Sequence, residues 1–181
     1  MKRVRSAIAA CALSLLLLAP ASAQRQHDSL TNPEIDQLRD TALEPDLRLK
    51  LYVKFARARL ASLEQARSDP KTTDRGQETH DRLQEFLDIY DEMNENIDNY
   101  VGRKSDLRKA LKPVIESDTE FQAKLRALKD AANTATEEAK HYEFLLSTAI
   151  ETLDSSAQDH RQLLTEQEEA AKQKKASKQK Q

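Results

Sequence analysis

The sequence predicts an all-α fold, an elongated bundle of four or five helices with coiled-coil-like packing. The chain of 181 residues contains only 2 glycines, whereas β-hairpins and phosphate-binding loops depend on glycine for their backbone conformations. Apolar residues recur at spacings of three and four over most of the chain, which is typical of amphipathic helices. β-Sandwiches, barrels, Rossmann domains and P-loops are therefore disfavoured as fold classes.

The first 23 residues have the three parts of a secretory signal peptide. A basic start at residues 2–5 is followed by an apolar run at 7–19 and by Ala21-Ser22-Ala23. We expect cleavage after Ala23 and a periplasmic or secreted mature protein. Cleavage also removes Cys11, the only cysteine of the chain. An uncleaved membrane anchor and a lipoprotein modified at Cys11 are the alternatives.

The mature chain divides into a helical bundle, residues 24–171, and a disordered Lys-rich tail, residues 172–181. The tail has five lysines and no acid, whereas residues 24–171 carry a net charge of −10. We expect the tail to be solvated, with weak contact with anionic surfaces as the alternative. An acidic exported protein is not expected to bind nucleic acid, and no segment of the mature chain is predicted to span a membrane.

Three helices are predicted in the N-terminal half, and each has a recognisable start or stop. The first begins with a capping box, in which Thr31 caps the helix and Glu34 reaches back to it. Pro45 ends that helix, and Gly102 is the expected stop of the third, after which Ser105 can cap the next segment. The predicted bounds are 31–43, 46–66 and 74–101.

One apolar series runs through the C-terminal half, from Leu107 to Leu163, in a single heptad register. It predicts either one long bent helix or two antiparallel helices, and the T-x-x-E capping signature at 134–137, next to Asn133, favours a break there. Pro113 is expected to kink its helix or mark a boundary, and residues 117–120 offer a second restart. Polar residues replace three members of the series, namely Asp118, Ser156 and His160.

One polar pattern in the sequence is a candidate site of chemistry. Glu138 and His141 form the Glu-x-x-His pattern of di-metal bundles, which need two copies; the chain has one, so we interpret His141 as a surface residue. No calcium-loop or nucleophile-elbow pattern is present in the sequence. We therefore assign no catalytic, cofactor-binding or metal-binding residue and expect no enzymatic activity and no cofactor.

Charged and aromatic side chains at helical spacing are interpreted as structural. A basic face on the second predicted helix should form ion pairs with an acidic face on the third and fix their antiparallel register. The tyrosines fall on apolar stripes and should be core residues whose hydroxyls reach the surface. The residues concerned are Lys50, Lys54 and Arg57 on the basic face, Glu85, Asp88, Glu92 and Glu95 on the acidic face, and Tyr52, Tyr90, Tyr100 and Tyr142.

The segment Leu30-Thr31-Asn32-Pro33-Glu34, followed by Ile35 and Leu38-Arg39, resembles the L-T-x-x-Q helix openings of periplasmic Spy/CpxP-type chaperones, with Glu34 in place of Gln. Residues 164–168, Leu-Thr-Glu-Gln-Glu, echo the same pattern. The resemblance implies a periplasmic chaperone or stress-sensing binder. Over its whole mature length the chain is similar to exported all-helical bacterial proteins of unassigned function, which implies a fold but no activity.

We expect a non-enzymatic exported interaction or structural protein of the bacterial cell envelope. Such a protein would contact a protein partner, or a second copy of itself, through helix faces. A Spy/CpxP-like chaperone or stress-sensing binder is the first alternative, and a metal-carrying helical bundle is the second.

Overall fold

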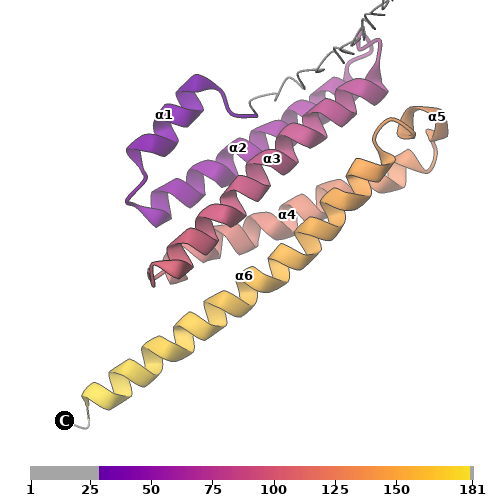
Figure 1. Cartoon of the computed structure of the whole chain (residues 1–181). Coiled ribbons are helices and arrows are strands. Elements are labelled where there is room, and N and C mark those ends of the chain that lie inside the picture. The colour runs from indigo at the N-terminus through magenta and orange to yellow at the C-terminus, as the bar shows by residue number, and fades with distance from the viewer. Residues whose placement is uncertain (1–28, 180–181) are drawn as a thin grey trace, which may run out of the picture.

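A computed structural model describes residues 29–179 and confirms the all-α prediction. Within these residues the chain forms six helices and no strand (Figure 1). The predicted signal peptide, residues 1–23, lies outside the described residues. The helices are α1 (Asn32–Asp40), α2 (Pro45–Ser68), α3 (Arg75–Gly102), α4 (Arg108–Ala132), α5 (Thr136–Ala139) and α6 (Glu143–Lys178).

The four long helices, α2, α3, α4 and α6, run along one common direction and enclose the core (Figure 1). Helix α2 packs against both α3 and α4, and α6 packs against both α4 and α3. The short helix α1 packs against α2. All four tyrosines are buried in the core, as predicted, together with Phe86 and Phe121, but the Tyr90 hydroxyl does not reach the surface as expected and bonds to the buried Asp118.

The predicted capping box begins α1, whereas the start of α2 at Pro45 and the cap of α3 by Asp74 are findings of the structure. The capping box at Thr31 forms, and the Thr31 backbone N–H donates to Glu34 Oε2 at 2.8 Å. Pro45 is the first residue of α2, where its missing N–H costs no helical hydrogen bond. Asp74 caps α3, because its Oδ1 accepts from the Gln77 N–H at 3.0 Å. The observed bounds agree with the predicted ones to within a few residues.

The turn between α3 and α4 differs from the predicted one. Helix α3 ends at Gly102, but the left-handed backbone conformation occurs at Lys104, with φ 59°. Ser105 does not cap α4; the Leu107 N–H instead donates to Gln167 Oε1 at 2.7 Å, and Gln167 Nε2 donates to the Ser105 carbonyl at 3.2 Å. Residues 164–168, which echo the L-T-x-x-Q pattern, lie within α6 and therefore do not begin a helix.

The C-terminal half is a helical hairpin, which settles the choice between one long helix and two. Helix α4 ends at Ala132, and the one-turn helix α5 leads into α6. The large seam residues Leu111, Leu146 and Leu153 are at most 1% exposed. Helix α4 runs through Pro113 and through residues 117–120, so neither is a boundary. Proline removes a single backbone donor there, and the buried side chains on either side hold the helix together.

The expectation of a disordered tail from Lys172 is wrong for residues 172–178, which continue α6. Ala, Gln and Lys are strong helix formers, and the preceding turns already provide the costly nucleus. Every side chain from Lys172 to Gln179 is exposed, so this end of α6 extends beyond the other long helices (Figure 1). No helix within residues 29–179 is long and apolar enough to cross a bilayer.

Candidate functional site: polar clusters in the bundle and a basic end

Three long helices contribute to a polar cluster in the middle of the core. Asp118 of α4 accepts a hydrogen bond from the Tyr90 hydroxyl of α3 at 2.8 Å, and its other oxygen lies 2.9 Å from His160 Nδ1 of α6. Tyr90 and Asp118 are fully buried, and His160 is 4% exposed. An ionised Asp118 can accept both bonds, provided that His160 carries its proton on Nδ1.

Ser156 and Asn94 extend this cluster along α3 and α6. Asn94 Nδ2 donates to Ser156 Oγ at 3.0 Å, and the buried Asn94 Oδ1 has no partner among the described residues. Burial raises the pKa of Tyr90, and the charge of Asp118 and its hydrogen bond raise it further. The cluster thus keeps Tyr90 neutral and joins three helices at one level, which is a structural role.

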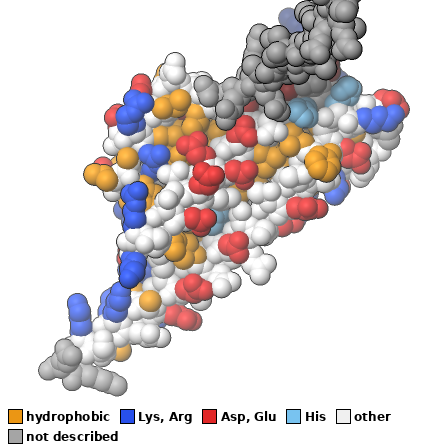
Figure 2. Space-filling model, viewed as in Figure 1, with side chains coloured by type: hydrophobic (Ala, Val, Ile, Leu, Met, Phe, Trp, Pro, Cys, Tyr) orange, Lys and Arg blue, Asp and Glu red, His pale blue; other side chains and the backbone are white. Residues whose placement is uncertain are grey.

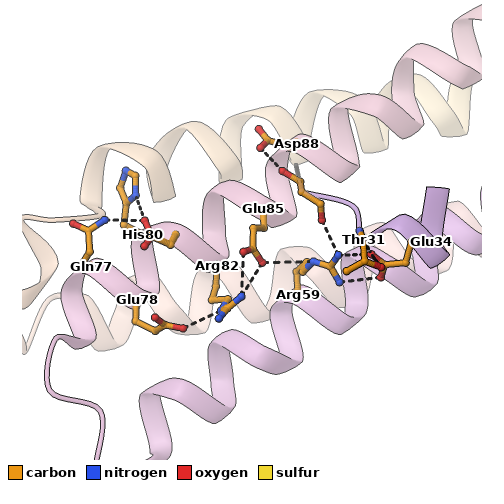
Figure 3. Close-up of polar contacts among 11 residues, drawn as sticks. Thr31, Glu34, Arg59, Gln77, Glu78, His80, Arg82, Glu85 and Asp88 are labelled. Carbon is orange, nitrogen blue, oxygen red and sulfur yellow. Dashed lines mark hydrogen bonds and ion pairs between the residues drawn. The ribbon is translucent and has the colours of Figure 1, made fainter. Parts of the chain in front are cut away.

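A second polar network, centred on Arg59 of α2, attaches α1 to the bundle (Figure 3). Its guanidinium donates to both oxygens of Glu34, at 3.0 and 2.6 Å, and to the Ser29 carbonyl at 2.7 Å. On its other side, Arg59 Nε lies 3.5 Å from Glu85 Oε2 of α3. The three charged side chains are 12–14% exposed, so the network is largely shielded from water.

Glu34 has two functions in this network. Its carboxylate completes the capping box of α1 and binds Arg59. Burial alone would raise the pKa of Glu34, but the hydrogen bonds from Arg59 and Thr31 outweigh burial and lower it. The residue that departs from the L-T-x-x-Q pattern is therefore the one that forms the ion pair.

The predicted ion pairs between α2 and α3 are wrong, although the two helices do pack together. Arg57 points to α4 and binds Glu120 at 2.8 Å, and the Lys54 ammonium lies 5.7 Å from the ring centre of Phe55. Glu92 accepts instead from the Tyr52 hydroxyl at 2.7 Å. A heptad pattern gives the spacing of charges along each helix, but the rotation of each helix about its axis decides which charges meet.

The acidic side chains of α3 that were predicted to pair have other partners. Glu85 binds Arg82 of its own helix at 3.1 Å as well as Arg59 (Figure 3). Asp88 accepts hydrogen bonds from Ser29 Oγ and, at 2.7 Å, from Gln84 Nε2. These carboxylates thus belong to the structural networks that hold α3 against its neighbours.

Arg67 joins α2 to the α5 end of the bundle. It forms an ion pair with Glu138 and donates to the Tyr142 hydroxyl at 3.3 Å. His141, the other half of the Glu-x-x-His pattern, is exposed as predicted and lies over Gly76, where an added Cβ would come within 2.8 Å of the imidazole ring. Among the described residues, no group of three or more potential metal ligands is close enough to hold an ion.

Two surface features lie outside these clusters. An apolar groove of about 350 Å³ runs between α2 and α4, with Leu63 and Leu128 at its base and Ala127 and Ala131 at its rim. At one end of the molecule, basic side chains of the α3–α4 turn and of the α6 terminus face a hollow of about 310 Å³. We call this second feature the basic end and define it by the charged residues of 103–112 and 172–178.

In the sequence, Asp118, Ser156 and His160 stand out only as interruptions of the apolar series. A single polar residue in a core seam is unremarkable, but three in one register have to find partners where the seam is buried. That requirement was the available signal for the buried cluster. The sequence could not show that Tyr90, on a helix outside the series, is the fourth member.

Comparison with known proteins adds no family to this geometry. The chain matches no protein-family model, no curated protein and no solved structure.

Proposed function

We propose that this chain is a non-enzymatic interaction protein of the bacterial cell envelope, exported by residues 1–23. One observation supports the proposal most. From Lys172 onward, α6 extends beyond the bundle as a helix whose side chains are all exposed. A helical segment that is polar all round can bridge to another component.

The polar clusters support the same proposal, because each is occupied by structural contacts. Asp118, Arg59 and Arg67 tie helices to one another, and their partners are side chains of this chain. The bundle is thus a scaffold that holds α6 in place and presents residues 172–178.

A truncation tests the proposal. The mature full-length chain and a variant that ends at Ala171 are compared by cross-linking in the cell envelope, followed by rebinding of the purified captured component. We expect one defined component that the full-length chain binds and the truncated chain does not. Because residues 172–178 are exposed, the truncation should leave the unfolding midpoint unchanged. Equal capture by both chains, or capture of nothing by either, contradicts the proposal.

The apolar groove between α2 and α4 favours a second candidate, a chaperone that binds exposed apolar segments of unfolded clients. Ala127 is exposed at the rim of the groove, so Ala127→Glu places a charge there without removing a core side chain. Ala123→Glu, one turn earlier on the exposed surface of α4, is the matched control. A chaperone should suppress aggregation of a reduced, unfolding client, and only Ala127→Glu should weaken this; equal suppression by both variants excludes the groove.

A further inference from the structure

Four segments that are distant in sequence meet at the basic end. The Tyr100 hydroxyl of α3 donates to the Ala42 carbonyl of the α1–α2 loop at 3.0 Å. Lys109 Nζ of α4 lies 2.8 Å from Asp46 Oδ2 of α2. Gln167 of α6 accepts the hydrogen bond from the Leu107 N–H at the start of α4. The side chains of these segments therefore share one surface of the molecule.

This surface is positively charged although the chain as a whole has a net charge of −2. Residues 103–112 hold five basic side chains and one acid, Asp106, and residues 172–178 hold four lysines and no acid, whereas residues 41–47 add the two acids Glu44 and Asp46. A hydrogen bond from Arg108 lowers the pKa of Asp106 to about 2, so this carboxylate is ionised and already neutralised by its neighbour. Asp46 and Glu168 lie at the side of the same surface, and Asp46 is paired with Lys109.

Exposed apolar side chains lie beside these charges. Leu43 of the α1–α2 loop is 88% exposed, and Leu47 and Val101, which begin α2 and end α3, are 44% and 39% exposed. The remaining large exposed apolar side chain among the described residues, Phe144, begins α6 next to α5, at the opposite end. Figure 2 shows blue side chains along one edge of the molecule down to the last described turns of α6, while red ones spread over the face beside it.

We propose that the basic end docks on the surface of an anionic lipid bilayer. Such a surface offers negative headgroups to the lysines and an acyl boundary to an exposed leucine, and both contributions add to binding. A nucleic acid or a soluble polyanion offers the charge alone and leaves Leu43 in water. The inference rests on the proposed interaction function and names the partner of the same α6 end.

Vesicle co-sedimentation of the full mature chain tests the charge. We expect binding to vesicles that contain phosphatidylglycerol, weak binding to phosphatidylcholine vesicles, and loss of binding as salt is added. The triple variant Lys172→Glu, Lys174→Glu and Lys175→Glu should lower the partition coefficient by at least about a hundred-fold, at roughly five-fold per charge. Reversal of Lys71, Lys129 and Lys140, which are exposed at the opposite end, makes the same change in net charge and should have little effect.

A second pair of variants tests the apolar contact. Leu43→Ser should lower partitioning about ten-fold, as expected for partial burial of one leucine, whereas Phe144→Ser at the opposite end should not. Both side chains are more than four-fifths exposed, so neither variant should unfold the chain.

Four outcomes overturn the lipid proposal, and the last of them also overturns the interaction function. The first is equal binding to neutral and anionic vesicles. The second is an unaffected Leu43→Ser variant together with full competition by soluble polyphosphate, which would identify a general polyanion site. The third is no vesicle binding while the truncation experiment still captures a protein through residues 172–178; the interaction function then stands without the lipid. Absence of both vesicle binding and a captured component contradicts both proposals.

Discussion

In both the α2–α3 pair and the α4–α6 pair, polar side chains connect two long antiparallel helices. The two pairs differ in how deeply these polar side chains are buried. Arg59 connects α2 to α1 and α3 through carboxylates that are 12–14% exposed. Asp118 connects α4 to α6 and α3 where it is fully buried. The depth of the polar contact should therefore decide how much each pair depends on it.

The physical reason lies in what remains after one partner is removed. A buried polar group that loses its partner keeps the full cost of desolvation, because water cannot replace the lost bond. A partly exposed group is rehydrated, and the loss is smaller. The central cluster should thus be the more sensitive of the two, although its contacts are fewer.

Removal of the central carboxylate should have the largest effect. Asp118→Ala leaves the Tyr90 hydroxyl and the His160 imidazole buried without their partner. At roughly 1–3 kcal/mol for each of the two groups left without a partner, we expect a loss of about 2–6 kcal/mol in the free energy of unfolding, measured by urea denaturation. Asp130→Ala, at an exposed position on the same helix, should change it by no more than about 0.5 kcal/mol. A loss below about 1 kcal/mol for Asp118→Ala would show that the cluster does not hold the hairpin.

The corresponding change in the α2–α3 half should be smaller. Arg59→Met keeps much of the side-chain volume but removes the hydrogen bonds to Glu34 and to the Ser29 carbonyl. We expect a loss of roughly 1.5–3 kcal/mol, the range for hydrogen bonds to charged groups, with α1 the first segment to exchange its amide protons. Arg57→Met, whose side chain is 48% exposed, is the control and should cost roughly 0–1 kcal/mol. Equal losses for both variants would mean that burial does not distinguish them.

The sequence predicts the helices well because their signals are local. The capping box at Thr31 and the cap at Asp74 mark helix starts by direct bonds to nearby backbone, Pro45 marks one by its fixed backbone angle, and the apolar seam marks the buried faces. Gln167 is an example of a helix cap that local signals do not reveal. It caps α4 from 60 residues away, and no local pattern around Ser105 or Leu107 could reveal that.

The candidate sites are less predictable because they depend on the rotation of whole helices. The positions of Asp118 and His160 in the heptad register placed them in the seam, but their bond to Tyr90 needed α3 in a particular orientation. The unknown rotation of each helix also explains why the predicted ion pairs between the basic face of α2 and the acidic face of α3 do not form. The exposed position of Leu43 beside the α3–α4 turn likewise depends on how α1 folds back, which Arg59 controls through Glu34.

A third prediction concerns how the stability that the central cluster contributes changes at alkaline pH. The pKa of Tyr90 is raised by burial and by Asp118, so the folded protein keeps this hydroxyl protonated while the unfolded chain ionises near pH 10. Its contribution to stability is thus complete below pH 10 and is lost as the pH rises, by up to about 1.4 kcal/mol per pH unit. The free energy of unfolding of Tyr90→Phe should fall less steeply than that of the wild type between pH 10 and 11. Parallel curves would show that the Tyr90 hydroxyl titrates alike in both states.

The smallest expected effect is the coupling energy between surface charges. It distinguishes an ion pair that the structure contains from one that only the sequence pattern indicates. Arg57 and Glu120 form an ion pair at 2.8 Å with side chains 48% and 36% exposed, so a double-mutant cycle to alanine should give a coupling of roughly 0.2–1 kcal/mol that weakens with salt. Lys54 and Glu92 lie on the two faces that the heptad pattern would pair, but Glu92 is bound to Tyr52 instead. Their cycle should give a coupling no larger than the error of about 0.3–0.5 kcal/mol found for sites without contact. Coupling between Lys54 and Glu92, combined with none between Arg57 and Glu120, would mean that α2 is rotated about its axis relative to the described arrangement. The buried contacts of the same helix would then change as well, because rotation moves Tyr52 and Arg59 together with the surface charges.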